Sequence, residues 1–157
     1  MSRAVQGDAQ AHWELAICYK FGKGVKSDKE KSFSCFKAAV ENGFEDGLIA
    51  LGGCYWQGFG TERNIEATLV CFDKEEARKD HATEAQLLYY RGLMYLEGCG
   101  GVEKDACLAV EHFKNANGLW APYKYLELAK CYHYGIGIAK DVNKSKIYAT
   151  EALHWRV

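Results

Sequence analysis

The sequence has no excess of charge of either sign, because 20 Lys and Arg residues stand against 21 Asp and Glu residues, a formal net charge of −1. The charges are also interspersed, so we expect no basic field and no nucleic-acid partner. The chain lacks an apolar run of membrane-spanning length and the apolar core of a signal peptide near its N-terminus. It is therefore expected to be soluble and cytoplasmic, without a membrane partner.

Catalytic motifs are missing as well. The sequence contains no Gly-x-Ser-x-Gly elbow, no Walker-type phosphate loop and no His-Glu-x-x-His pair. Cys99, Cys107 and His112 could supply three metal ligands, but their spacing matches no familiar zinc site. We therefore expect no enzyme activity, no cofactor and no metal, with a metal-dependent enzyme as the remote alternative.

What the sequence does contain is a fourfold repeat. A Gly-x-Gly pair occurs four times, and its first glycines follow one another at intervals of 36, 40 and 37 residues. The first glycines are Gly22, Gly58, Gly98 and Gly135. A tyrosine lies three residues before each pair, as Tyr19, Tyr55, Tyr95 and Tyr132. Fixed periods of this size are typical of stacked supersecondary units.

Each unit is predicted to be a helix, a glycine turn and a second helix. A small residue three positions before the tyrosine lets a neighbouring helix approach closely; these residues are Ala16, Gly52, Gly92 and Ala129. After the glycines comes a short side chain that can cap the second helix, namely Asp28, Asn64, Asp105 and Asp141. An aromatic ring then follows within that helix, as Phe36, Phe72, Phe113 and Tyr148.

These residues resemble the Sel-1-like repeat family, a relative of the tetratricopeptide repeats. The resemblance covers nearly the whole chain, with local departures at Arg91, which replaces a leucine, and at the extra Gly101. It implies an all-α fold, a right-handed α-α superhelix (solenoid) of about four helix-turn-helix repeats in a single domain, residues 1–157. The repeats are expected at about residues 8–43, 44–80, 83–118 and 121–157.

The seven cysteines are interpreted mainly as core residues. Three of them share the site before the repeat tyrosine, where the third repeat has Met94; they are Cys18, Cys54 and Cys131. Cys35 and Cys71 share a second site. Interchange with apolar residues is typical of small buried hydrophobes. Only Cys99 and Cys107 could pair, and only in an oxidising compartment.

The resemblance also implies a partner-binding surface, because first helices line the concave side of such superhelices. The partner-binding residues expected on it are Trp13, Ile17, Lys20, Phe21, Ile49, Trp56, Gln57, Tyr89, Leu93, Leu96, Tyr123, Leu126, Lys130, His133 and Tyr134. Gln10, Asp46, Gly53, Gln86 and Glu97 complete the twenty concave positions. Most of these positions are apolar or aromatic, which favours an interaction site.

The leading hypothesis is a non-catalytic adaptor or scaffold that binds a peptide or helix of another protein in the concave groove. The charged residues Lys20, Asp46, Glu97 and Lys130 would then set its register. One alternative is a self-assembling segment of a longer array, a homo-oligomer through uncapped ends. Another is that rings such as Trp13 and Tyr123 pack between adjacent first helices. Residues 44–84, with nine acidic and four basic residues, predict a solvated acidic face.

Overall fold

The computed structural model describes residues 3–78, 83–117 and 121–154 of the chain. Within these residues the regular elements are all helices and no strand occurs. The predicted class, an all-α array of helix-turn-helix repeats, is confirmed. The chain forms two compact units, Met1–Lys79 and Asp80–Val157, and each contains two helical hairpins. That all four repeats belong to one domain stays a prediction.

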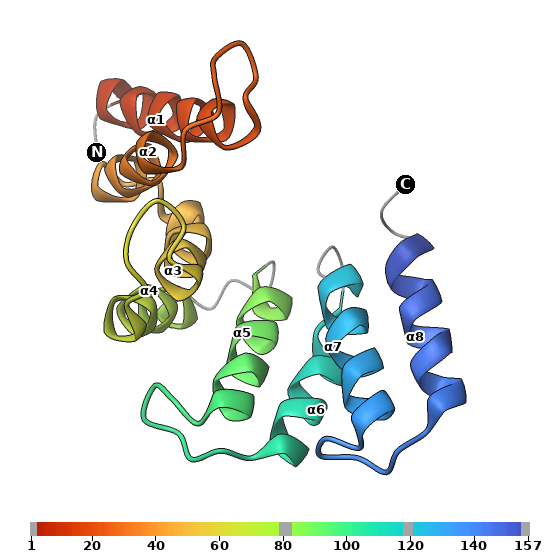
Figure 1. The fold of residues 1–157 in the computed structure, drawn as a ribbon. Helices are drawn as coiled ribbons and strands as arrows, with labels where there is room; N and C mark the ends of the chain where they lie inside the picture. The colour runs from red at the N-terminus through yellow and green to blue at the C-terminus, as the bar shows by residue number, and fades with distance from the viewer. Residues whose placement is uncertain (1–2, 79–82, 118–120, 155–157) are drawn as a thin grey trace. The chain divides into compact units, whose positions relative to one another are not determined.

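The first unit consists of two stacked hairpins. Helices α1 (Arg3–Phe21) and α2 (Lys29–Glu41) form the first hairpin. A short 3-10 helix, η1 (Glu45–Gly47), leads into the second, made of α3 (Leu48–Gln57) and α4 (Ile65–Ala77). Within each hairpin the two helices pack along each other, and α2 packs on α3 (Figure 1).

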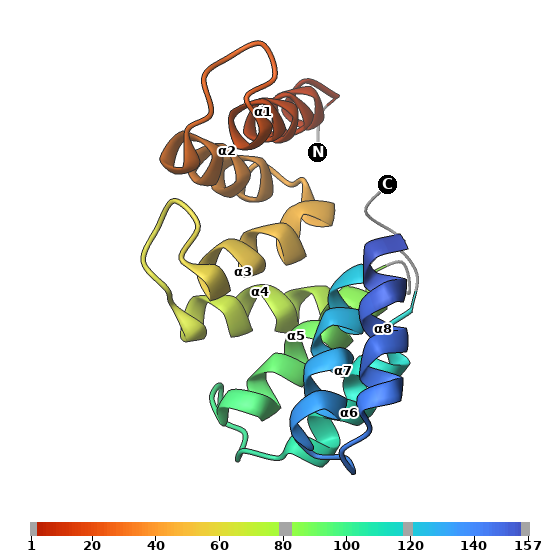
Figure 2. The ribbon, with the colours of Figure 1, turned by 45° about the vertical axis from the view of Figure 1, so that its right-hand side comes forward.

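The second unit repeats this arrangement. Helices α5 (Glu84–Glu97) and α6 (Ala106–Asn115) form one hairpin, and α7 (Ala121–Tyr134) and α8 (Val142–His154) form the other. Here α6 packs on α7, while α7 and α8 run side by side (Figure 2). In both units the second helix of one hairpin therefore packs on the first helix of the next.

The four turns are closed by the same hydrogen bonds. The first glycine is left-handed, as at Gly58 (φ 66°) and Gly98 (φ 68°), where a side chain would be strained. The backbone N–H of the predicted cap donates to the carbonyl of the repeat tyrosine at 2.9–3.0 Å in all four repeats. Each cap side chain also accepts a backbone N–H three residues on, at 2.9–3.0 Å. The predicted N-caps are confirmed.

The second glycine of the pair forms the contact between hairpins. A Cβ added at Gly60 would collide with the carbonyl oxygen of Lys29, in the first turn of α2, and would lie 2.9 Å from the Cβ of Phe33. In the second unit, a Cβ at Gly137 would collide with the carbonyl oxygen of Ala106 in α6. In each unit the turn of the second hairpin thus lies directly against the start of the second helix of the first hairpin.

The rings of the second helices fill the hairpin cores. Phe36, Phe72 and Phe113 are at most 1% exposed. A Cβ at Gly52 would lie 2.5 Å from the Phe72 ring, and one at Gly92 would lie 2.6 Å from the Phe113 ring. The close approach expected at the small residues is confirmed.

A buried hydroxyl, which the sequence analysis missed, joins the two helices of three hairpins. Ser32 Oγ donates to the carbonyl of Ala16 at 2.8 Å, and Ser145 Oγ donates to that of Ala129 at 2.9 Å. Thr68 Oγ1 lies 3.3 Å from the carbonyl of Gly52. The third repeat has Ala109 at this position. The bond therefore reinforces the hairpin without being required by it.

Replacing Ser32 with alanine should lower the free energy of unfolding by about 1 kcal/mol, because it removes one buried hydrogen bond and leaves a small void. Urea unfolding followed by circular dichroism measures the change. Ser34, exposed on the same helix, is the matched control, and Ser34→Ala should leave the stability unchanged. Equal effects of the two substitutions would contradict this role of the Ser32 hydroxyl.

The burial expected of the cysteines at the two shared repeat positions is confirmed for three of the five. Cys54, Cys71 and Cys131 are buried. Burial raises the pKa of Cys54 and of Cys131 to about 11, so both thiols stay protonated at neutral pH. Cys18 and Cys35 are half-buried, which is less than expected. All seven cysteines lie in the described part of the chain and none of them is in a disulfide, Cys99 and Cys107 included.

The acidic second repeat is organised around Arg78 rather than being solvated throughout. The guanidinium donates to Asp46 Oδ1 at 2.6 Å and to Glu75 Oε2 at 2.9 Å, and its Nε lies 3.6 Å from Glu45 Oε2. Glu75 is only 1% exposed, so the solvated position expected for it is wrong. The equivalent position in the other three repeats is a buried alanine, at Ala39, Ala116 and Ala152.

Candidate interaction surface

The end of α1 exposes two of the predicted partner-binding residues. Lys20 is exposed and Phe21 is 61% exposed. Ile17 and Trp13 are half-buried. Trp13 packs within the first unit, with its ring 5.0 Å from that of Phe36 and 4.9 Å from that of Phe44. Only part of the Trp13 side chain is therefore accessible to a partner.

Helix α3 does not form the open surface expected of it. Ile49 is 2% exposed and Trp56 is 6% exposed, so the exposure expected for both is wrong. The reason is visible in the helix itself, because Leu48–Gln57 contains no charged residue and packs against α2, α4 and η1. A helix that is apolar on all sides is buried. Arg63 lies 4.5 Å from the centre of the Trp56 ring, and only Gln57 is exposed.

Helix α5 is also largely covered. Tyr89 is 9% exposed, again contrary to expectation, and its ring lies 5.9 Å from Phe113 and 6.1 Å from Tyr123. Burial raises the pKa of Tyr89 to about 12, so the phenol stays neutral. The contact with Tyr123 joins the first helices of repeats three and four, as the packing alternative predicts. Leu93 and Leu96 are half-buried.

Helix α7 presents four exposed residues, called here the α7 surface: Tyr123, Lys130, His133 and Tyr134. Tyr123 is 52% and Tyr134 69% exposed, and the rings of His133 and Tyr134 meet edge to face at 4.6 Å. Lys130 forms an ion pair with Glu127 at 2.8 Å. Leu126 is half-buried beside them. The exposed partner-binding residues thus lie at the ends of α1 and α3 in one unit and along α7 in the other.

The structure adds residues that the sequence analysis did not place on the surface. Lys20 Nζ lies 5.3 Å from the centre of the Phe21 ring and 5.9 Å from that of Phe59, which belongs to the next turn. Lys23 lies over Phe21 and Lys29 over Phe59, at 5.6 and 5.9 Å. Lys20, Phe21, Lys23, Lys29 and Phe59 are called the basic turn cluster below.

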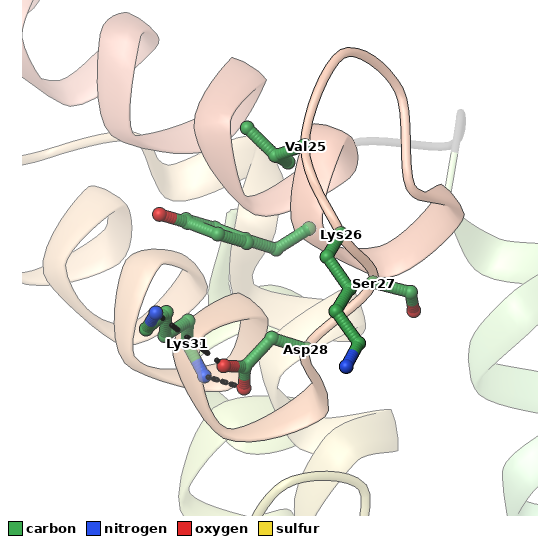
Figure 3. A pocket seen from close by; sticks show the side chains of 6 residues that line it. Val25, Lys26, Ser27, Asp28 and Lys31 are labelled. Atoms are coloured by element: carbon green, nitrogen blue, oxygen red, sulfur yellow. Dashed lines mark hydrogen bonds and ion pairs between the residues drawn. The ribbon is translucent and has the colours of Figure 1, made fainter.

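A pocket of about 510 Å³ is lined in part by the same turn of the first repeat (Figure 3). It is lined by Tyr19, Val25, Lys26, Ser27, Asp28 and Lys31. Asp28 accepts the backbone N–H of Lys31 at 3.0 Å and pairs with its ammonium at 3.6 Å. The backbone hydrogen bond is the main reason why the pKa of Asp28 is lowered. Asp28 therefore serves as a helix cap, and the two lysines give the pocket a positive lining.

The proposed metal ligands do not come together. Within the residues that the structure describes, no three His, Cys, Asp or Glu side chains are grouped as a metal ion would require. His112, one of the three candidates, stacks on Tyr95 at 5.2 Å, and burial is the main reason why its pKa is lowered. In the part of the chain described, no helix is both long and apolar enough to cross a membrane.

Comparison with known proteins identifies the repeat. The sequence pattern of the Sel1 repeat matches residues 9–44, 46–74, 85–117 and 125–154. The chain belongs to the Sel1 repeat family. This Sel1 repeat chain is 28% identical over 149 residues to the uncharacterized protein NMB1327 of Neisseria meningitidis serogroup B, covering 95% of the chain and 30% of that protein.

A second relative of the Sel1 repeat chain is the DAP3-binding cell death enhancer 1 of Rattus norvegicus. It is 30% identical over 80 residues, which cover 51% of the chain and 15% of that protein. The chain thus spans less than a third of the length of the curated relatives it matches.

Two solved structures have the same fold. One is c5321, a protective antigen of uropathogenic Escherichia coli with an SLR fold, at a TM-score of 0.59 and 26% identity, covering 96% of this chain and 31% of that one. The other is a Sel1 repeat protein from Oxalobacter formigenes, at a TM-score of 0.65 and 23% identity, covering 99% and 61%. Both similarities support the Sel1 solenoid class.

Proposed function

We propose that this Sel1 repeat chain is a non-catalytic protein–protein interaction module whose exposed first-helix residues bind a peptide or helix of another protein. Sel1 repeats generally act as interaction modules. The observation that carries the proposal is the exposure of large aromatic side chains on first helices: Phe21 at 61%, Tyr123 at 52% and Tyr134 at 69%. Rings of this size dominate the binding energy of protein interfaces when a partner covers them.

The proposed binding residues are fewer than the sequence suggests. Ile49, Trp56 and Tyr89 now count as core residues, because a partner cannot reach buried side chains without unfolding the hairpin. The proposed set consists of the basic turn cluster with Gln57 in the first unit and the α7 surface in the second. One relative, the DAP3-binding protein of rat, is named for binding another protein, which is consistent with this class of function.

Site-specific photo-crosslinking in a native lysate tests the proposal. A photoreactive phenylalanine analogue at position 21 or 134 should give discrete adducts with another protein, because these side chains would lie in the interface. The matched controls carry the same analogue at Val70 or Ile147, which are 51% and 60% exposed on second helices. Adducts of equal yield from all four positions, or none from the first helices, would refute it.

Self-assembly remains the second candidate because α8 exposes apolar side chains. Val142 is 41% exposed and Leu153 is 61% exposed. Their equivalents in α2 are Lys29 and Val40, and both contact the next hairpin. The backbone carbonyl of Lys29 lies against Gly60, and Val40 Cγ2 would lie 3.1 Å from a Cβ at Gly47. The same crosslinking experiment distinguishes the two candidates, since an analogue at Leu153 would then give adducts at multiples of the chain's own 17.6 kDa.

A further inference from the structure

The turn of the first repeat is basic in a way that the fold does not require. Four exposed lysines occupy it: Lys20, Lys23, Lys26 and Lys29. The equivalent positions are Trp56, Phe59, Glu62 and Ile65 in the second repeat, Leu96, Cys99, Glu103 and Ala106 in the third, and His133, Ile136, Ala139 and Val142 in the fourth. None of these is a lysine or an arginine, although all four turns have the same backbone hydrogen bonds. The repeats therefore act as an internal control, and the lysines need an explanation other than folding.

The charges of these lysines are left uncompensated. Among the residues that the structure describes, no carboxylate lies within ion-pair distance of Lys20, Lys23, Lys26 or Lys29, whereas Lys31 is paired with Asp28. Lys29 is also the first residue of α2, where the helix dipole disfavours a positive charge. The charge of Lys29 therefore lowers the stability of the helix, and its side chain is exposed.

The lysines surround aromatic rings instead. Lys20, Lys23 and Lys29 place their ammonium groups 5.3 to 5.9 Å from the centres of the Phe21 and Phe59 rings. Cation–π attraction at such distances holds the ammonium groups near the rings without neutralising their charge. Phe21 comes from the end of α1 and Phe59 from the turn between α3 and α4. The basic turn cluster thus joins two stacked hairpins of one unit into a single mixed surface.

We propose that the basic turn cluster is the docking site for an acidic peptide segment of the partner protein, with an apolar side chain of that segment on Phe21 and Phe59. This inference rests on the proposed function, because Lys20 and Phe21 belong to the first-helix surface. Charge complementarity selects the acidic partner. The chain as a whole has a net charge of −1 and interspersed charges, so a long polyanion such as nucleic acid would meet acidic residues beyond its first contacts with the cluster.

Fluorescence anisotropy with a short labelled peptide of repeating Asp-Glu-Phe tests the inference. The chain should bind it saturably, and the affinity should fall as salt is raised from about 50 to about 300 mM. The triple variant Lys20→Gln, Lys23→Gln, Lys29→Gln should weaken binding by about tenfold or more, as expected when several charged contacts are lost. The control triple Lys140→Gln, Lys144→Gln, Lys146→Gln makes the same charge change on exposed lysines of the second unit and should change it less than about twofold.

The inference would be overturned by no saturable binding, by equal losses in the two triple variants, or by tighter binding of a single-stranded DNA oligonucleotide of the same charge. A peptide with Asn and Gln in place of Asp and Glu should bind weakly, and binding of equal strength would also overturn it. Failure of this inference can be distinguished from failure of the proposed function. Partner adducts from position 21 together with no peptide binding would leave the interaction module standing and reject only the acidic partner.

Discussion

Replacing Gly60 or Gly137 with alanine should lower the free energy of unfolding by about 3–5 kcal/mol. Both glycines have positive φ, 69° and 65°, which an L side chain adopts only with strain. In addition, the new Cβ would collide with a backbone carbonyl at the start of the preceding second helix. A backbone atom cannot move aside as a flexible side chain can, so the two hairpins of the unit must separate.

Each of these substitutions has a matched control within its own unit. Gly24 has φ 72° and Gly101 has φ 81°, but a Cβ at either would meet nothing within 4 Å. Gly24→Ala and Gly101→Ala should therefore cost only the backbone strain, about 1 kcal/mol each. Urea unfolding followed by circular dichroism measures all four variants. If Gly60→Ala were no more destabilising than Gly24→Ala, the second glycine would serve the turn alone and not the contact between hairpins.

Replacing Arg78 with alanine should lower the free energy of unfolding by about 3 kcal/mol, because it removes the cation that lies 2.9 Å from the buried Glu75 carboxylate. The guanidinium also joins the beginning of the second repeat, at Asp46, to the end of α4. Hydrogen bonding to Asp46 is the main reason why the pKa of Arg78 is raised. The guanidinium therefore stays charged around neutral pH, so the loss of stability should vary little there.

A double-mutant cycle separates the ion pair from simple loss of side-chain contact. Glu75→Ala introduces the residue that the other three repeats carry at this position. The variant with both substitutions should therefore be more stable than Arg78→Ala alone, with a coupling free energy above about 1 kcal/mol. Lys37→Ala is the control, since its 3.9 Å pair with Glu41 is exposed and should contribute less than about 0.5 kcal/mol. Additive effects of the Glu75 and Arg78 substitutions would contradict the coupling.

The exposure of the concave positions could be predicted only in part. Phe21, Tyr123 and Tyr134 are exposed as the repeat pattern implies, whereas Trp56 and Tyr89 occupy equally concave positions and are buried. The difference arises because the pattern gives the direction of a side chain but not the size of its neighbours. A stronger signal was present in Leu48–Gln57, whose lack of charged residues is typical of a buried helix.

The sequence by itself determined the hairpins, because the features that build them act over short distances. The left-handed glycine, the Asp or Asn cap and the ring opposite a small residue each depend on neighbours within one repeat, and fourfold recurrence makes them recognisable. Only the tertiary structure decided what lies between hairpins: that Gly60 meets the start of α2, that Lys20 reaches Phe59, and that Glu75 is buried beneath Arg78. The Gly60 and Lys20 contacts join different hairpins, and Arg78 joins the end of α4 to Asp46 in η1, so their geometry follows from how the helices pack.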